Sequence, residues 1–112
     1  MPFWDDVNLS ALPDLKDRLL LLDVYVNPER FRFNAVGKEL GTSYANLFLD
    51  KAELGGPLAF LRSQCSATVE AKMPTYYEQA AAATGSGFSR LLMPMWGDGH
   101  IGMLLGAIEI RY

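Results

Sequence analysis

The side chains in this sequence that could carry out chemistry are few and widely spaced. His100 is the single histidine and Cys65 the single cysteine, and the acidic candidates for general acid or base are Asp23 and Asp98. Asp98 and His100 together could form an acid–base pair. However, Asp-Gly is first of all a hairpin-turn signal, and no serine, cysteine or lysine beside them stands in a nucleophile motif. We therefore expect no catalytic residues and no enzyme activity.

The same side chains are poor candidates for metal binding. Cys65 shares an apolar helical stripe with Leu61 and Val69, a pattern typical of a buried structural cysteine. His100 directly follows a predicted turn, and loops are usually exposed. A metal site would need several His, Cys or clustered carboxylate side chains, and the sequence clusters none. We expect no metal and no cofactor.

Composition narrows the class of protein and its partners. The chain has 112 residues, the size of one domain, and half of them are apolar. The net charge is −3 and the ten basic residues are scattered, which argues against nucleic acid as a partner. A single cysteine suits a reducing compartment, and the longest aliphatic run, 19–22, is too short to span a membrane. No signal peptide is visible, so we expect a cytoplasmic protein.

The first half of the chain predicts two paired strands. Leu19–Val26 is apolar on both alternating faces until Asp23, which is typical of a central strand covered on both sides. After a turn at 27–29, Arg30–Val36 alternates cleanly and should pair with its predecessor as a hairpin. Residues 1–18 form an arm with two aromatic side chains, Phe3 and Trp4, and we expect it to pack on its own domain or on a partner chain.

The second half predicts one longer helix and three strands. Pro57 suits the first position of the helix, and Met73-Pro74 should end it. A strand is expected at 75–80, and the apolar runs on either side of the glycine-rich turn at 97–99 form a hairpin. In the last strand, simple alternation places Gly102 and Gly106 on one face and Ile101 on the other with Met103. The two glycines leave gaps that admit either a ligand or a closely packed neighbour.

The order of the elements is that of PAS domains: two strands, small helices, a longer helix and three strands. The motifs with PAS-like spacing are Leu-Leu-Leu-Leu-Asp-Val (19–24), Arg-Phe-Arg-Phe-Asn-Ala-Val-Gly (30–37), Gly41-Thr42, Ser-Arg-Leu-Leu-Met-Pro-Met (89–95) and Gly-Asp-Gly (97–99). Over residues 8–112 the sequence resembles the compact PAS-type family of bacterial proteins. The resemblance implies an α+β, PAS-like (profilin-like) fold, with a five-stranded antiparallel sheet of order 2-1-5-4-3 and helices on one face. The domain would span 19–112 after the arm.

The resemblance also implies a function. It predicts a sensory or protein-interaction module in signal transduction, without its own output domain, that acts by small-ligand binding, by dimer contacts or by both. Haem and flavin are disfavoured, because His100 lies beyond a turn and Ser63-Gln64-Cys65-Ser66 departs from the Asn-Cys-Arg-Phe motif of flavin photosensors. The predicted pocket wall, whose default role is core packing, is Phe31, Phe33, Tyr44, Phe48, Leu61, Cys65 and Leu92.

The sequence leaves several partners and two alternative functions open. Helices on one side leave the other sheet face apolar, so we expect a homodimer. The predicted interface is Phe3, Trp4, Leu19, Leu21, Met103 and Leu105. A signalling protein or a small apolar ligand is a further possible partner. The alternatives are a ligand-free structural interaction domain and a small α+β enzyme of the cone-shaped isomerase or dehydratase type, which would need Asp23 or Asp98 in an apolar cavity.

Overall fold

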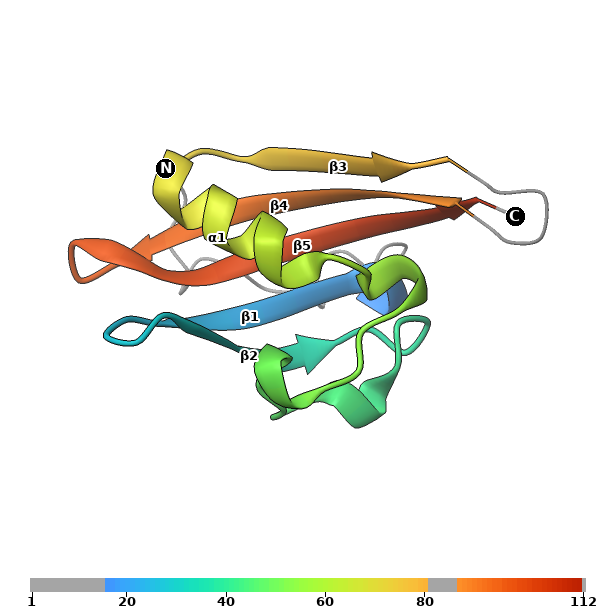
Figure 1. Cartoon of the computed structure of the whole chain (residues 1–112), viewed down its shortest axis with the longest axis horizontal. Helices are drawn as coiled ribbons and strands as arrows, with labels where there is room; N and C mark the ends of the chain where they lie inside the picture. The colour runs from blue at the N-terminus through green and yellow to red at the C-terminus, as the bar shows by residue number, and fades with distance from the viewer. Residues whose placement is uncertain (1–15, 81–86, 112) are drawn as a thin grey trace.

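The protein folds around one five-stranded antiparallel sheet, seen in a computed structural model that describes residues 16–80 and 87–111 (Figure 1). The strand order is β2-β1-β5-β4-β3, which confirms the order that the resemblance implies. The strands are β1 (Leu19–Tyr25), β2 (Arg30–Val36), β3 (Thr75–Gln79), β4 (Gly87–Gly97) and β5 (His100–Arg111), and the helix is α1 (Leu61–Ala71).

Strand β1 lies inside the sheet, as its two-faced apolar pattern predicts. Leu22 pairs with Phe33 of β2 on one side and with Leu104 of β5 on the other. Leu20 and Leu22 are fully buried on the face that carries the core. A strand with neighbours on both sides and a covered face excludes water from its apolar side chains, which is why this run tolerates so few polar residues.

Helix α1 begins later than the sequence predicts. It starts at Leu61, because Phe60 adopts a left-handed conformation with φ 60° that a helix cannot continue through. Pro57 instead lies in a short 3₁₀ helix, η6 (Gly56–Leu58). At the other end, Lys72 is also left-handed, and its backbone N–H donates to the Thr68 carbonyl oxygen at 2.9 Å. The helix therefore ends just before the predicted Met73-Pro74 stop.

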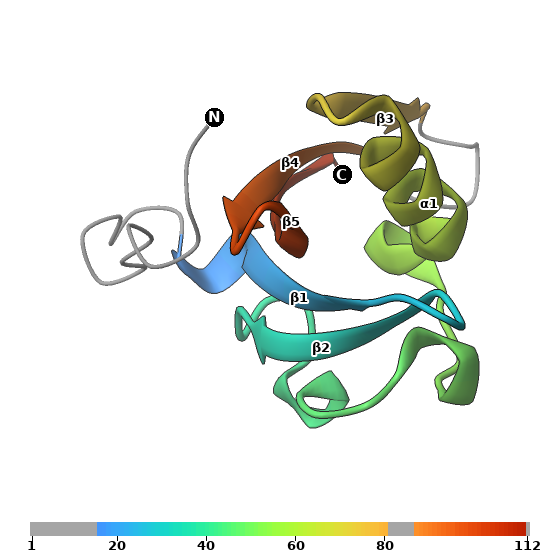
Figure 2. The ribbon, with the colours of Figure 1, turned by 90° about the vertical axis from the view of Figure 1, so that its left-hand side faces the viewer.

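The core lies between one face of the sheet and α1 together with residues 40–60 (Figures 1 and 2). Two further 3₁₀ helices, η4 (Thr42–Tyr44) and η5 (Leu49–Lys51), belong to this layer.

Close packing explains why one of the two glycines of the last strand is a glycine. A Cβ on Gly106 would lie 2.9 Å from Leu20 side-chain atoms and 3.0 Å from Leu92. The gap at Gly106 is thus filled by neighbouring side chains.

A bulge in β5 overturns the predicted alternation at its start. Met95 pairs with Met103, but the next residue, Trp96, pairs with Ile101, so Gly102 is an extra residue on β5. An inserted residue reverses the side to which the following positions point. Ile101 therefore joins the core at 6% exposure instead of lying beside Met103 on the outer face.

The two edges of the sheet differ. The edge of β2 is covered by residues 46–48, through hydrogen bonds from the Phe33 N–H to the Leu47 carbonyl (2.9 Å) and from the Asn46 N–H to the Phe33 carbonyl (2.7 Å). At the opposite edge, β3 pairs with β4 alone among the described strands. None of the helices in the described ranges is long and apolar enough to cross a membrane.

Candidate functional site

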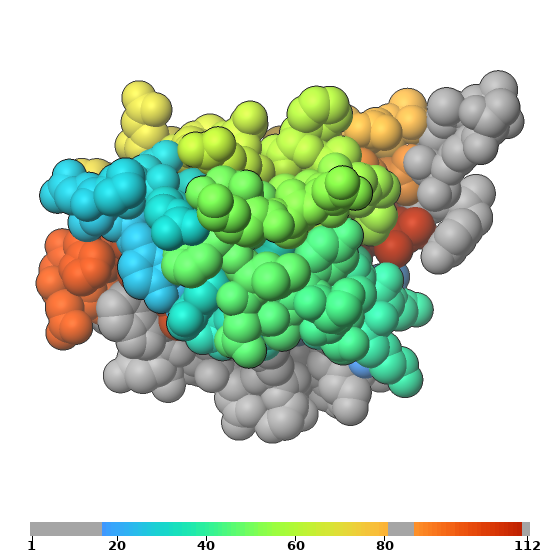
Figure 3. All heavy atoms as spheres, turned by 60° about the horizontal axis from the view of Figure 1, so that its bottom comes forward, coloured from blue at the N-terminus to red at the C-terminus, as the bar shows by residue number. Residues whose placement is uncertain are grey.

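An apolar recess of about 230 Å³ opens at one end of the molecule. The turn between β1 and β2 and the turn between β4 and β5 both lie at this end (Figure 3), and the last turn of α1 ends there too (Figure 1). The recess is lined by Val26, Val69, Lys72, Trp96, Gly99, His100 and Ile101. Segments far apart in the chain therefore meet around one concave surface, which is where small-molecule sites usually form.

The local backbone of the β4–β5 hairpin builds one wall of the recess. Asp98 and Gly99 both have positive φ, 53° and 81°, the combination that a tight two-residue hairpin turn requires. The sequence predicted this turn from its Asp-Gly pair. The bulge at Gly102 then brings Ile101 to the same side as Trp96, so that both face the end of α1.

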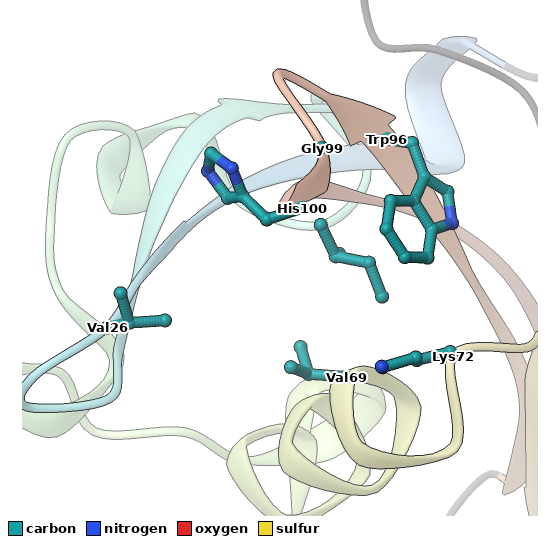
Figure 4. A pocket seen from close by; sticks show the side chains of 7 residues that line it. Val26, Val69, Lys72, Trp96, Gly99 and His100 are labelled. Atoms are coloured by element: carbon teal, nitrogen blue, oxygen red, sulfur yellow. The ribbon is translucent and has the colours of Figure 1, made fainter.

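Two side chains with polar nitrogen atoms, Lys72 and His100, stand among the apolar walls. Lys72 extends over the end of α1 beside Val69, and Trp96 and His100 lie on the opposite wall (Figure 4). The Nδ1 atom of His100 is 3.3 Å from the carbonyl oxygen of Asp98. Among the residues that the structure describes, no aspartate or glutamate lines the recess. Chemically, the recess offers apolar contact area and positive charge.

Deeper in the fold, the space between α1 and β4 holds a buried arginine. Arg90 is 0% exposed. Its Nε donates to Gln64 Oε1 at 2.6 Å, and its Nη1 donates to the Pro57 carbonyl at 2.9 Å. The guanidinium also lies 5.3 Å from the Tyr77 ring and 5.2 Å from the Phe88 ring. Desolvation lowers the pKa of Arg90, but a guanidinium remains charged in proteins.

Gln64 links this arginine to the neighbouring strand β3. Its amide nitrogen donates to the Thr75 carbonyl (3.2 Å), to Thr75 Oγ1 (3.1 Å) and to the Arg90 carbonyl (3.2 Å). Thr68 Oγ1 lies 2.6 Å from Thr75 Oγ1. The Nη2 of Arg90 has no hydrogen-bond partner in the described part of the chain. Hydrogen-bonded polar side chains thus occupy the space between α1 and strands β3 and β4.

The residues predicted as a pocket wall lie together, but around the core. Five of them are fully or almost fully buried in it: Phe31, Phe33, Leu61, Cys65 and Leu92. Tyr44 packs beside Phe33 with ring centroids 5.4 Å apart, and Phe48 lies under the Arg30 guanidinium at 3.8 Å. None of the seven lines the recess. Burial raises the pKa of the Cys65 thiol, so it is held in the unreactive neutral form.

The recess itself was missed by reasoning from the sequence. The sequence predicts an exposed position for His100 after a turn, and the structure shows that it is both exposed and part of the lining. Two local signals could have pointed to the site. Trp96 directly precedes the turn, and Lys72 directly precedes the helix stop at Met73-Pro74. Neither signal reveals that the two segments meet.

The other predicted site residues lie elsewhere. Asp23 is on the outer sheet face, 2.7 Å from Arg32 Nη2, and Asp98 is exposed in its turn. Phe3 and Trp4 fall outside the described residues. Of the remaining predicted interface, Leu19 is 3% exposed. The partly exposed members are Leu21, Met103 and Leu105. Within the described ranges, no three His, Cys, Asp or Glu side chains group as metal ligands.

Comparisons of the chain with protein-family models, with curated proteins and with solved structures gave no match.

Proposed function

We propose that this domain is a PAS-like sensory module that binds a small molecule in the recess between the end of α1 and the two hairpin turns. The observation that carries the proposal is the recess of about 230 Å³ with its mainly apolar lining. The strand order and the single helix layer support the PAS-like assignment, since they agree with what the sequence resemblance implies. No output domain is part of this proposal.

The position of the recess suggests how occupancy could be transmitted. A bound molecule would contact Val69 on α1, Val26 after β1 and Trp96 on β4 at the same time. Ligand contacts can shift a conformational equilibrium only by favouring one arrangement over another. Binding here would favour the arrangement in which these three elements are drawn together, and a partner protein would sense that arrangement.

A fragment-binding experiment tests the proposal. Isotope-labelled protein is titrated with small apolar fragments, and amide shifts are followed by NMR. We expect shifts concentrated at 69–72 and 96–101. The variant Val69→Phe fills the recess and should remove them, whereas Ala67→Phe places the same phenylalanine at an exposed position of α1 and should not. If no fragment moves these amides, or if Val69→Phe binds as well as the unmodified chain, the recess is not a binding site.

A second candidate function, protein interaction through a homodimer, is favoured by the outer face of the sheet. Tyr76 of β3 is 61% exposed and pairs with Leu91 of β4, which is 38% exposed. Leu91 in turn pairs with Ala107, and Met93 pairs with Leu105. Apolar side chains therefore continue from the edge strand toward the predicted interface residues at the centre of the sheet.

Analytical ultracentrifugation measures the oligomeric state directly. We expect a species of twice the 12.4 kDa chain mass at micromolar concentration. Leu91→Lys should shift it to monomer without disturbing the core, because the Leu91 side chain is exposed. A monomer before any substitution would rule out the homodimer. The cone-shaped enzyme alternative gains no such support, since neither Asp23 nor Asp98 lines the recess.

A further inference from the structure

Lys72 occupies a backbone position that usually belongs to glycine. It directly follows the last residue of α1, with φ 58° and ψ 32°. Helices commonly end in this left-handed conformation, and glycine dominates there because it has no Cβ to clash with the following carbonyl. A residue with a Cβ atom is strained at this position, and strained residues gather at functional sites. The strain therefore raises the question of what the lysine does.

The Lys72 side chain lies where a ligand charge could reach it. It is exposed and forms part of the recess lining, extending beside Val69 toward the space between α1 and Trp96 (Figure 4). Residues 16–80 and 87–111 supply no carboxylate within ion-pair distance of its ammonium group. The protein as a whole is acidic, with net charge −3, so a recess whose described lining carries a lysine and no carboxylate differs from the average surface of the protein.

We propose that Lys72 is the anion-binding residue of this recess, and that the recess takes a small organic carboxylate with a compact apolar body. The inference rests on the proposed ligand-binding function and names the chemical class of the ligand. The apolar body would contact Val69, Trp96 and Ile101, and the carboxylate would lie at the rim against the lysine. At about 30 Å³ per water-sized volume, a space of 230 Å³ suits a single ring with a short chain.

A purely structural role for Lys72 predicts something different. Cations near the carboxyl end of a helix are stabilised by its dipole, so the lysine could serve the stability of α1 alone. In that case its removal would lower the melting temperature and leave ligand selectivity unchanged. Under our proposal the two effects separate, because glycine relieves the backbone strain while it removes the charge.

Three probes of one shape and different charge test the ligand class: phenylacetate, neutral phenylacetamide and cationic 2-phenylethylamine. Each is titrated into the full chain at constant ionic strength, and the amides at 69–72 and 96–101 are followed by NMR. We expect phenylacetate to bind about fivefold more tightly than the amide, as for an exposed ion pair, and the amine to bind most weakly. Lys72→Gln and Lys72→Gly should bring phenylacetate to the affinity of the amide, and Lys72→Arg should retain the preference.

Two controls complete the test. Lys51→Gln removes an exposed lysine that is not part of the recess, and it should leave the preference for the anion intact. Lys72→Gly should melt no lower than the unmodified chain. Equal affinity for all three probes, or an unchanged preference in Lys72→Gln, would overturn the assignment of Lys72 while leaving the recess as a binding site. The absence of shifts with every probe would refute the proposed function as well.

Discussion

Replacing Gln64 with leucine should destabilise this protein more than replacing the buried arginine that it contacts. Gln64→Leu keeps the size of the side chain but removes the acceptor for Arg90 Nε at 2.6 Å. A hydrogen bond to a charged group contributes about 1.5–3 kcal/mol. The amide nitrogen of Gln64 also bonds to Thr75 and to the Arg90 carbonyl, and its two hydrogens contribute about 1 kcal/mol each.

The expected loss follows from these contacts. We expect Gln64→Leu to lower the free energy of unfolding by about 3.5–5 kcal/mol, in line with the loss of one partner of a buried charge. At an unfolding entropy of about 2.1 cal/mol/K per residue, a chain of 112 residues loses about 4 °C per kcal/mol. The melting temperature should therefore fall by about 14–20 °C.

Calorimetry and urea unfolding of Gln64→Leu, two further variants and a control measure these losses of stability. Arg90→Met removes the buried charge itself, and buried ions can often be replaced by apolar side chains at little cost. The double variant Gln64→Leu/Arg90→Met should then be more stable than Gln64→Leu alone. Gln79→Leu, the same change at an exposed site on β3, serves as the control and should stay within about 0.5 kcal/mol of the unmodified chain.

Two results would refute this reasoning. One is a loss below about 1 kcal/mol for Gln64→Leu, the size of an ordinary neutral hydrogen bond. The other is additivity, in which the double variant loses the sum of the two single losses. Additivity would mean that the two side chains do not depend on each other.

Three other measurements test further features of the fold. Gly106→Ala should destabilise the fold by about 1–3 kcal/mol through overpacking, because the added Cβ would lie 2.9 Å from Leu20. The control Gly55→Ala should be tolerated, because nothing lies within 4 Å of the added Cβ. Equal melting temperatures for the two variants would contradict this prediction. The Cys65 thiol, fully buried and with its pKa raised by desolvation, should react with a thiol reagent only at the rate of unfolding, and rapid labelling of the native protein would show that α1 opens locally. Desolvation opposes ionisation of Asp50, but its hydrogen bond and charge interaction with Arg30 outweigh it and lower the pKa. That pair should stabilise the fold above the ordinary carboxylate pKa of about 4 and lose its effect as the pH falls further, so urea midpoints should depend less on acid in Asp50→Asn than in the unmodified chain.

The sequence was sufficient for the sheet because its signals are local. Leu19–Tyr25 is apolar on both faces, and Asp98-Gly99 requires a tight turn. The strand order was implied by the resemblance to PAS domains, and the order in the structure agrees with it. The alternation rule assumes that every residue reverses the side to which the next one points. It therefore does not predict the extra residue at Gly102, which turns Ile101 toward the core.

The candidate site was less accessible to such reasoning, because it depends on contacts between distant segments. Val26, Val69 and Trp96 belong to three different elements, and no spacing rule connects them. The sequence does not distinguish Arg90 from the other scattered basic residues. Gln64, which accepts its hydrogen bond, lies 26 positions away in the chain. The sequence also does not predict the left-handed backbone at Phe60 and Lys72, because neither residue type favours that conformation.

The placement of β5 between β1 and β4 has a consequence for how the protein is made. Strands β1 and β2 can pair as soon as they emerge from the ribosome, and so can β3 and β4, but only β5 joins the two halves. Leu20 finds its partner Gly106 only after nearly the whole domain has been synthesised. Until then the nascent chain exposes two unfinished strand edges, which are prone to aggregate. The domain should therefore fold only once β5 has cleared the exit tunnel, and nascent-chain chaperones would have to shield both halves in the interval.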